Sequence, residues 1–416
     1  MSYLGVLRNK ELATLWIGQV FSAIGDALYE VAITWFAVKA LGNRAGLIVA
    51  AGSGSALMFS LFGGVYADRW NRRRTMVAVD ILRAFIVLSL PVAARFGPLN
   101  PWHLALVTAS LAILGSIFSP SLTASLPLLA PERSTLRAAN ALMDSTWRIA
   151  RAIGPSLTGF LIAQMPLQEF FSLDAISFGV SAMAVFRLGN RLDRQIQPIA
   201  ARPKALTELA QTFKAVSQQS FFFWTLVLTF FACVFWSAIF YVGVALLCKE
   251  LPKGNIAAFG MLMGSYGCAS VASNLFWGGV NPKKPAIIMF GGDVLMGLGF
   301  LLFAQSQSLT FAALAIALGA LGGPMGDLVL RYLIQHQFPN EQIGKVYSLR
   351  WTIANLGVAL GLLISGPVFQ ILGTRTAISV LAYGYLICGG IGLIRFFNES
   401  IEEEVVETQA AQTIDA

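Results

Sequence analysis

Long apolar runs recur along the whole chain, and short polar stretches separate them. An α-helix rises 1.5 Å per residue, so about 20 residues cross the roughly 30 Å hydrocarbon layer of a membrane. Within lipid, segments of this length satisfy their backbone hydrogen bonds only as helices. The pattern therefore predicts an all-α membrane protein with twelve transmembrane helices. The expected spans are 12–39, 45–67, 76–97, 102–128, 139–166, 170–188, 219–247, 255–277, 286–305, 310–335, 346–372 and 376–397.

Composition agrees with a chain that is embedded in lipid. Of the 416 residues, 56% are hydrophobic and only 12% are charged, whereas soluble proteins carry roughly 25% charged residues. The net charge of +8 is better explained by the orientation of loops in the membrane than by nucleic acid. We therefore expect membrane lipid and a small-molecule substrate as partners, and no nucleic-acid partner.

The distribution of Lys and Arg predicts the orientation of the chain. With the N-terminus in the cytoplasm, these residues fall about three times as often at the inner ends of the spans as at the outer ends. Basic residues are retained on the cytoplasmic side of membranes. Both termini are therefore predicted to be cytoplasmic.

One long polar stretch, Leu188 to Gln219, divides the spans into six and six. Its prolines and charges are typical of a linker. "GGV" follows the second span at Gly63 and the eighth at Gly278, which indicates a duplication. Parallel repeats of this kind place a substrate site between the halves. The predicted parts are an N-terminal six-helix bundle (1–188), a cytoplasmic linker (189–218), a C-terminal six-helix bundle (219–397) and a disordered acidic tail (398–416).

The loop after the second span carries a recognisable motif, "GGVYADRWNRRR". The chain resembles a major facilitator superfamily transporter, and this loop resembles the hallmark of that superfamily between helices two and three. Asn71 stands where the motif usually has a second glycine. The resemblance covers essentially the whole chain and implies the major facilitator fold, with two pseudo-symmetric six-helix bundles, and a monomer. The motif residues are Gly64, Asp68, Arg69, Arg72 and Arg73.

Two shorter strings narrow the resemblance. "SAIGDALYEVAITW" in the first span and "FFSLDAISFGVSA" in the sixth resemble the branch that contains enterobactin-type siderophore exporters and macrolide efflux pumps. This similarity implies a multi-pass protein of the bacterial plasma (inner) membrane. It also implies siderophore export or multidrug resistance as the physiological role.

The motif loop is expected to act as a conformational latch. Asp68 can meet the positive N-terminus of a helix that begins near Lys345, and Arg69, Arg72 and Arg73 can pair with Asp68, Glu132 or lipid phosphate. The alternative is that the arginines only fix topology. The second copy, "GGVNPKK", has no carboxylate, so the latch is expected to work mainly through the first half.

Two acidic residues lie within the first span. Asp26 is near its middle, and Glu30 follows four residues later on the same face. An ionisable group at this depth costs at least about 2.5 kcal/mol, so it should face a cavity or a partner. Either residue is a candidate for carrying the coupling proton or for binding a cationic substrate. The alternative, favoured for Glu30, is a structural role.

The fifth span combines charges with a kink motif. Asp144 and Arg148 are four residues apart and can form an internal ion pair, and Arg151 either faces the cavity and favours anionic substrates or pairs structurally. Gly154, Pro155 and Gly159 resemble the antiporter signature of exporters, although the spacing differs by one residue and a double glycine is absent. A packing kink is the alternative.

Further charged and aromatic residues lie in other spans. Asp80 and Arg83 are expected at an inner gate or interface, and Asp174 is expected to cap or pair near the outer surface. Trp236 and Tyr241 either line a cavity for an aromatic substrate or belong to the aromatic belts at the membrane surface. The predicted gate of the second half consists of Asp327, Arg331 and Arg350.

Enzymatic chemistry has little support in the sequence. The two histidines are far apart, the four cysteines form no CxxC pair, and no GxxxxGK[ST] nucleotide-binding loop is present. We therefore expect no metal, no cofactor and a proton gradient as the energy source. The sequence predicts a proton-coupled antiporter that exports a siderophore or drug-like compound by alternating access. An importer of a small nutrient and, less favoured, a lipid-modifying membrane enzyme are the alternatives.

Overall fold

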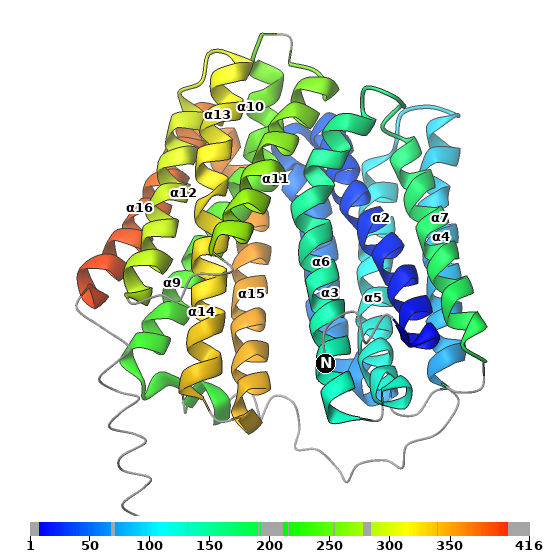
Figure 1. Cartoon of the computed structure of the whole chain (residues 1–416). Coiled ribbons are helices and arrows are strands. Elements are labelled where there is room, and N and C mark those ends of the chain that lie inside the picture. The colour runs from blue at the N-terminus through cyan, green and yellow to red at the C-terminus, as the bar shows by residue number, and fades with distance from the viewer. Residues whose placement is uncertain are drawn as a thin grey trace, which may run out of the picture. The chain divides into compact units, whose positions relative to one another are not determined.

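A computed structural model describes residues 8–67, 71–130, 132–189, 192, 211–214, 216–252, 254–277, 284–338 and 340–397. The regular elements within these ranges are helical (Figure 1). The first part of the chain forms α2 (Lys10–Leu41), η1 (Gly42–Ala45), α3 (Gly46–Ala67), α4 (Arg72–Ala94), α5 (Pro101–Leu129), α6 (Arg133–Leu161) and α7 (Glu169–Arg187). The second part forms α9 (Ser220–Ser237), η3 (Ala238–Gly243), α10 (Val244–Glu250), α11 (Ile256–Trp277), α12 (Pro285–Ala304), α13 (Leu309–Ala320), α14 (Gly322–Gln337), α15 (Asn340–Leu372) and α16 (Thr374–Phe396).

Ten stretches among the described residues are helical, long and apolar enough to cross a membrane. One of them, Lys10–Ala56, takes in α2 and the start of α3, so two of the predicted spans run together. The helix of the fifth predicted span, α6, is not among the ten; it carries charged residues along much of its length. The prediction of an all-helical membrane protein is confirmed, and the count of twelve crossings stays a prediction.

Two compact units divide the chain. The first comprises Met1–Arg202, Gly254–Gly267 and Ser365–Pro367, and the second comprises the remaining residues. The change from one to the other at residue 202 falls inside the stretch that the sequence predicts to be a linker.

Helix starts in the first unit follow the side chains that precede them. The side chain of Asn9 accepts hydrogen bonds from two backbone N–H groups at the start of α2, and Asn71 and Asn100 each accept one at the start of α4 and α5. Asparagine is among the best residues at this position because it satisfies N–H groups that have no partner within the helix. Pro101 then occupies the first turn of α5, where a missing N–H costs nothing.

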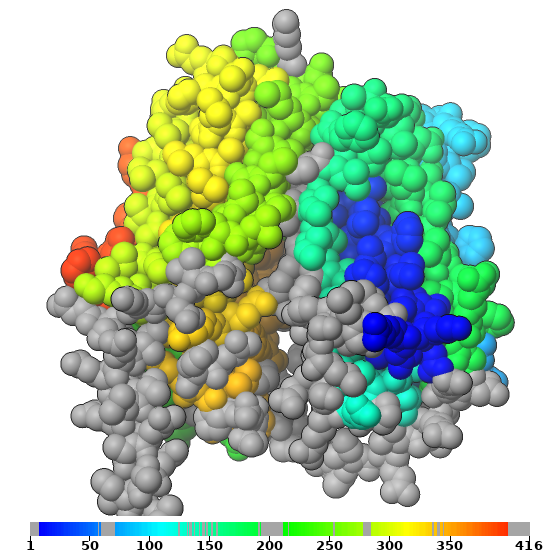
Figure 2. All heavy atoms as spheres, viewed as in Figure 1, coloured from blue at the N-terminus to red at the C-terminus, as the bar shows by residue number. Residues whose placement is uncertain are grey.

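Helix α2 is central to the first unit. It packs against α6 and α7, while α4 packs against α5 and α7. In Figure 2 the blue atoms of α2 reach the surface between those of α6 and α7. Leu12 and Leu15 of α2, Met76 of α4 and Phe118 of α5 belong to one buried cluster, so the helices that carry the charged residues described below share a core.

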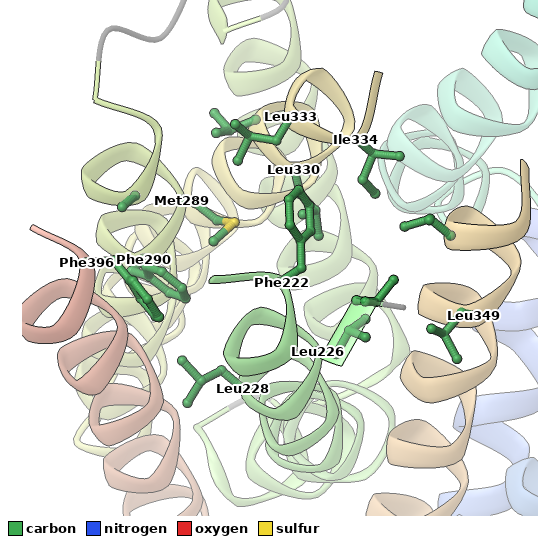
Figure 3. Close-up of a cluster of buried hydrophobic side chains, with 14 of the residues drawn as sticks. Phe222, Leu226, Leu228, Met289, Phe290, Leu330, Leu333, Ile334, Leu349 and Phe396 are labelled. Atoms are coloured by element: carbon green, nitrogen blue, oxygen red, sulfur yellow. The ribbon is translucent and has the colours of Figure 1, made fainter. Parts of the chain in front are cut away.

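The second unit is organised around α12, which packs against α13, α14 and α16. Glycines allow the backbones to approach each other, because a Cβ atom at Gly292 would lie 2.5 Å from the carbonyl oxygen of Gly322. Close helix contacts of this type are common in membrane proteins. The core nearby is aromatic: Figure 3 shows Phe290 and Phe396 side by side, with Phe222 close to Leu330.

Two predicted spans of the second unit are not continuous α-helices. The seventh contains a π-helical segment, η3, between α9 and α10. The tenth is divided at Leu321 into α13 and α14. Pro324 explains the second break, because its ring nitrogen cannot donate a hydrogen bond to the carbonyl of Ala320. π-Helical segments occur frequently at functional sites.

Candidate functional site

Asp80 and Arg83 of α4 are buried inside the first unit. Asp80 is fully buried and Arg83 is 9% exposed. The nearest approach of their charged groups joins Arg83 Nη1 to Asp80 Oδ1 over 3.7 Å. Neither oxygen of Asp80 has a hydrogen-bond partner of normal geometry among the described residues, although the Ser181 hydroxyl of α7 is near it. Their burial against α5 and α7 therefore makes Asp80 and Arg83 interior groups of the unit.

Asp174 of α7 is the second fully buried carboxylate of this unit. The hydroxyl of Ser177 lies 3.4 Å from its Oδ1, and its Oδ2 has no hydrogen-bond partner among the described residues. Gly25 of α2 gives it room, since a Cβ atom at that position would lie 2.6 Å from Asp174 Oδ1. Asp174 was expected to cap or pair near the outer surface; the structure places it instead in the interior of the unit, against Gly25 of α2.

The guanidinium group of Arg83 reaches α5 and α7. Its Cζ lies 5.1 Å from the ring centre of Phe118 and 5.3 Å from that of Phe178. Phe178 is one helical turn from Asp174, so the two share a face of α7. Gly115 makes space on α5, where a Cβ atom would lie 2.8 Å from Arg83 Nη2. Arg83 is therefore within electrostatic range of both buried carboxylates, Asp80 and Asp174.

Asp26, the acid that the sequence singles out, lies beside this group. It is partly buried on α2 and within electrostatic range of Asp80 and Asp174. It follows Gly25, the residue of α2 that packs against Asp174 and Ser177 of α7. The structure thus places the predicted candidate next to two acids that the sequence assigned to other roles.

A buried polar seam continues from these acids along α2 and α7. Gln19 Nε2 donates to Ser181 Oγ over 3.0 Å, and both side chains are buried. Further along α2, the hydroxyl of Tyr29 lies 2.9 Å from that of Thr108. The serines at 177 and 181 follow Asp174 at helical spacing, and this polar stripe in an apolar helix is the signal that sequence reasoning overlooked.

The described part of the latch motif ties two helices of the first unit together. Arg73 Nη2 donates to the carbonyl oxygen of Phe186 over 2.9 Å, and its Cζ lies 4.8 Å from the centre of the Phe186 ring. Arg72 begins α4, and Gly64 lies in α3. Asp68 and Arg69 lie outside the described residues, so the latch stays a prediction.

The fifth predicted span corresponds to α6. Gly154 is buried where a Cβ atom would collide with Ala27 of α2, so this glycine allows α6 to approach α2. Gly159 lies near the end of α6. Glu30, on the α2 side, is partly buried. The predicted side-chain roles on α6 are not described by the structure; they concern Asp144, Arg148, Arg151 and Pro155.

A second charged group lies in the other unit. Arg350 of α15 pairs with Asp327 of α14, and the gate role of these residues stays a prediction. Arg331 follows one turn later on α14 and is partly buried. Asp293 of α12, which sequence reasoning missed, lies near the Tyr385 hydroxyl of α16 and within electrostatic range of the pair.

The two units place an acid at corresponding points. Asp80 comes eight residues after Arg72, the first residue of α4, and Asp293 comes eight residues after Pro285, the first residue of α12. Helix α4 packs against α7 as α12 packs against α16. If the sequences of α4 and α12 are aligned at their first residues, Asp293 falls opposite Asp80. This alignment is the signal that would have identified Asp293.

Aromatic side chains gather at the π-helical segment. Trp236 stacks on Phe240 with ring centres 4.9 Å apart, and Tyr241 meets both rings edge-on. Trp236 and Tyr241 are partly exposed. Among the residues that the structure describes, no group of three or more His, Cys, Asp or Glu side chains can hold a metal ion.

Comparison with known proteins gives a consistent result. A profile of the family described as "Transmembrane secretion effector" matches residues 1–413. Macrolide efflux protein A of Streptococcus pyogenes is 24% identical over 367 residues, which cover 85% of this chain and 87% of that protein. The multidrug efflux pump Tap of Mycolicibacterium fortuitum is 23% identical over 390 residues, covering 89% and 91%.

Solved structures of transporters share the fold. The nucleoside transporter NupG aligns with a TM-score of 0.71 at 10% identity and covers 94% of this chain and 100% of that one. A POT family transporter in complex with 5-aminolevulinic acid aligns with a TM-score of 0.70 at 14% identity, covering 93% and 96%. At these identities the likeness concerns the fold alone.

Proposed function

The chain belongs to the transmembrane secretion effector family of the major facilitator superfamily, and from this premise we propose that it exports drug-like organic molecules in exchange for protons. The family and its relatives are transporters, so the chain is a membrane transporter and not an enzyme. The proposal that transport is outward rests on the match with efflux proteins over at least 85% of this chain.

The substrate class is a drug-like molecule. The names of the relatives refer to macrolides and to multiple drugs, and both relatives are matched along most of their length. The partly exposed aromatic group of Trp236, Phe240 and Tyr241 supports this class, because aromatic faces bind apolar and cationic ring systems. Siderophore export rests on the two short strings in α2 and α7 and is the weaker alternative.

Proton coupling is the proposed energy source. Ionisable residues inside membrane-spanning helices are expensive and mark ion or substrate pathways. Both units contain such residues, with Asp26, Asp80 and Asp174 in the first and Asp293 in the second. A nucleotide-binding loop, the usual sign of direct ATP use, is absent from the sequence.

Other predicted residues take supporting roles in this proposal. Asp26 takes part in proton transfer beside the buried acids. Arg151 of the first unit and, separately, Trp236 and Tyr241 of the second are the candidates for contacts with substrate. Gly64, Asp68, Arg69, Arg72 and Arg73 bias the equilibrium between inward- and outward-open states, and Asp327 with Arg350 closes the inner side of its own unit. The protein works as a monomer in a bacterial inner membrane with both termini in the cytoplasm.

An accumulation assay tests the proposed function. Cells that overproduce the chain are expected to hold several-fold less labelled erythromycin than cells with an empty vector. A protonophore is expected to abolish the difference, because it removes the driving force. Higher accumulation on overproduction would indicate import, and an unchanged level for erythromycin and for ethidium would remove drug export as the function.

A further inference from the structure

The first unit holds two carboxylates in a place where an ionised carboxylate is poorly accommodated. Asp80 and Asp174 are both fully buried. Both oxygens of Asp80 and one oxygen of Asp174 have no hydrogen-bond partner of normal geometry among the described residues. A buried charge without hydrogen bonds costs several kcal/mol, and the cost disappears when the group binds a proton.

A single guanidinium group serves both acids. Arg83 is 3.7 Å from Asp80 and within electrostatic range of Asp174. One arginine neutralises one carboxylate, so the pair of acids carries one negative charge too many when both are ionised. Asp26, on the neighbouring α2, adds repulsion to each of them.

Among the described residues, Arg83 is the cation named as acting on Asp80 and on Asp174. Helix α2 contributes Asp26 and the hydroxyl of Tyr29, which approach Asp174. Helix α5 has one titratable residue, His103, and it bonds to Ser89 near the other end of α4. Helix α7 contributes the hydroxyls of Ser177 and Ser181.

The geometry favours a proton over a larger ligand. The space beside Gly25 is taken by Asp174, and the space beside Gly115 is taken by Arg83. No described set of acidic side chains converges as a metal site requires. The only species that corrects the charge without needing volume is a proton.

We propose that Asp80 and Asp174 form a proton-binding pair with Arg83 as their shared cation. One proton resides on the pair, and Arg83 pairs with whichever carboxylate is ionised. Binding forms one O–H bond on a carboxylate oxygen, and release returns that proton to water. The coupling of this step to transport rests on the proposed function, whereas the binding of the proton does not.

Infrared spectroscopy tests proton binding without any substrate. Exposed carboxylates are ionised above about pH 6, so a carboxylic-acid carbonyl band that persists there in the reconstituted protein reports buried acids. Asp80→Asn and Asp174→Asn are each expected to remove part of this band. Glu250→Gln, which changes a half-exposed acid that pairs with Arg375, is expected to leave it unchanged. A band unaltered in both Asn variants, with thermal unfolding like that of the unsubstituted chain, would overturn the proposal.

A second measurement tests coupling in proteoliposomes. Exchange of labelled for unlabelled erythromycin needs no net proton movement, whereas uphill accumulation does. Asp80→Asn is expected to keep exchange within about twofold and to lose about tenfold or more of the accumulation driven by a pH gradient. Retention of gradient-driven accumulation by both Asn variants would overturn the coupling role. If the unsubstituted chain moves no erythromycin, the proposed function fails, and the infrared result still decides the proton site.

Discussion

A chain that carries Gly292→Leu is expected to accumulate in the membrane at a small fraction of the normal level. A Cβ atom at this position would lie 2.5 Å from the carbonyl oxygen of Gly322 and 2.8 Å from Cβ of Met325. The first of these atoms belongs to the backbone of α14, which can move only if the packing of the unit changes. Overpacking usually costs about 1–3 kcal/mol, and a backbone clash on a central helix belongs at or above the upper end.

The neighbouring residue provides a matched control. A Cβ atom at Gly291 would meet nothing within 4 Å, so Gly291→Leu makes the same chemical change one position earlier on the same helix. Membrane abundance and the thermal unfolding midpoint in detergent should be close to normal for Gly291→Leu and strongly reduced for Gly292→Leu. Equal behaviour of the two variants would show that α12 and α14 do not pack as described.

The helices and the family could be predicted from the sequence because both depend on local pattern. Apolar runs of transmembrane length mark the helices, and the "GGVYADRWNRRR" loop marks the superfamily. The break between α13 and α14 was within reach, since Pro324 follows two glycines. The π-helical segment η3 has no comparable signal, because its residues Ala238–Gly243 are ordinary for a membrane helix.

The candidate site was harder to predict because it depends on how neighbouring helices are rotated. From the sequence, Asp80 and Arg83 were expected at an inner gate or interface near the end of the third span. That Asp174 lies on the same side of the unit follows only from the packing of α4 on α7. The glycines that make room for it, Gly25 and Gly115, look in sequence like any other glycines of a membrane helix. The packing of α4 on α7, which the sequence does not reveal, therefore determines that Asp80 and Asp174 are both near Arg83.

The correspondence between Asp80 of the first unit and Asp293 of the second could not be recognised while each charged residue was considered by itself. Asp26 drew attention because it stands near the middle of the first span, whereas Asp293 stands within a run that contains no other charge. Only the helix starts at Arg72 and Pro285 show that Asp80 and Asp293 correspond. The partners have diverged: Arg83 approaches Asp80 from the same helix, whereas the group near Asp293 is the hydroxyl of Tyr385 on α16. In the first unit the acids Asp26, Asp80 and Asp174 lie on α2, α4 and α7, and Arg83 is within electrostatic range of the two that are fully buried.

Removal of the shared cation has the second large expected effect. Arg83→Gln removes the guanidinium group that lies 3.7 Å from Asp80 and within electrostatic range of Asp174, whereas the repulsion of both acids by Asp26 remains. The loss of one partner from a buried ion pair costs about 3–5 kcal/mol, so the thermal unfolding midpoint of Arg83→Gln should fall well below that of the unsubstituted chain. Asp80→Asn alone should change the midpoint little, because Arg83 then still serves Asp174.

A double-mutant cycle shows whether the destabilisation comes from charge. If Arg83 stabilises the unit by compensating Asp80, the chain with both Arg83→Gln and Asp80→Asn should be more stable than the chain with Arg83→Gln alone, by about 1 kcal/mol or more. The interaction energy should shrink as the pH of the measurement falls, because protonated acids need no cation. If the two substitutions add independently at every pH, then Arg83 acts only through its contacts with Phe118 and Phe178. Compensation of Asp80 by Arg83 predicts the opposite: the double variant is destabilised by less than the sum of the two single substitutions at neutral pH, and this difference disappears in acid.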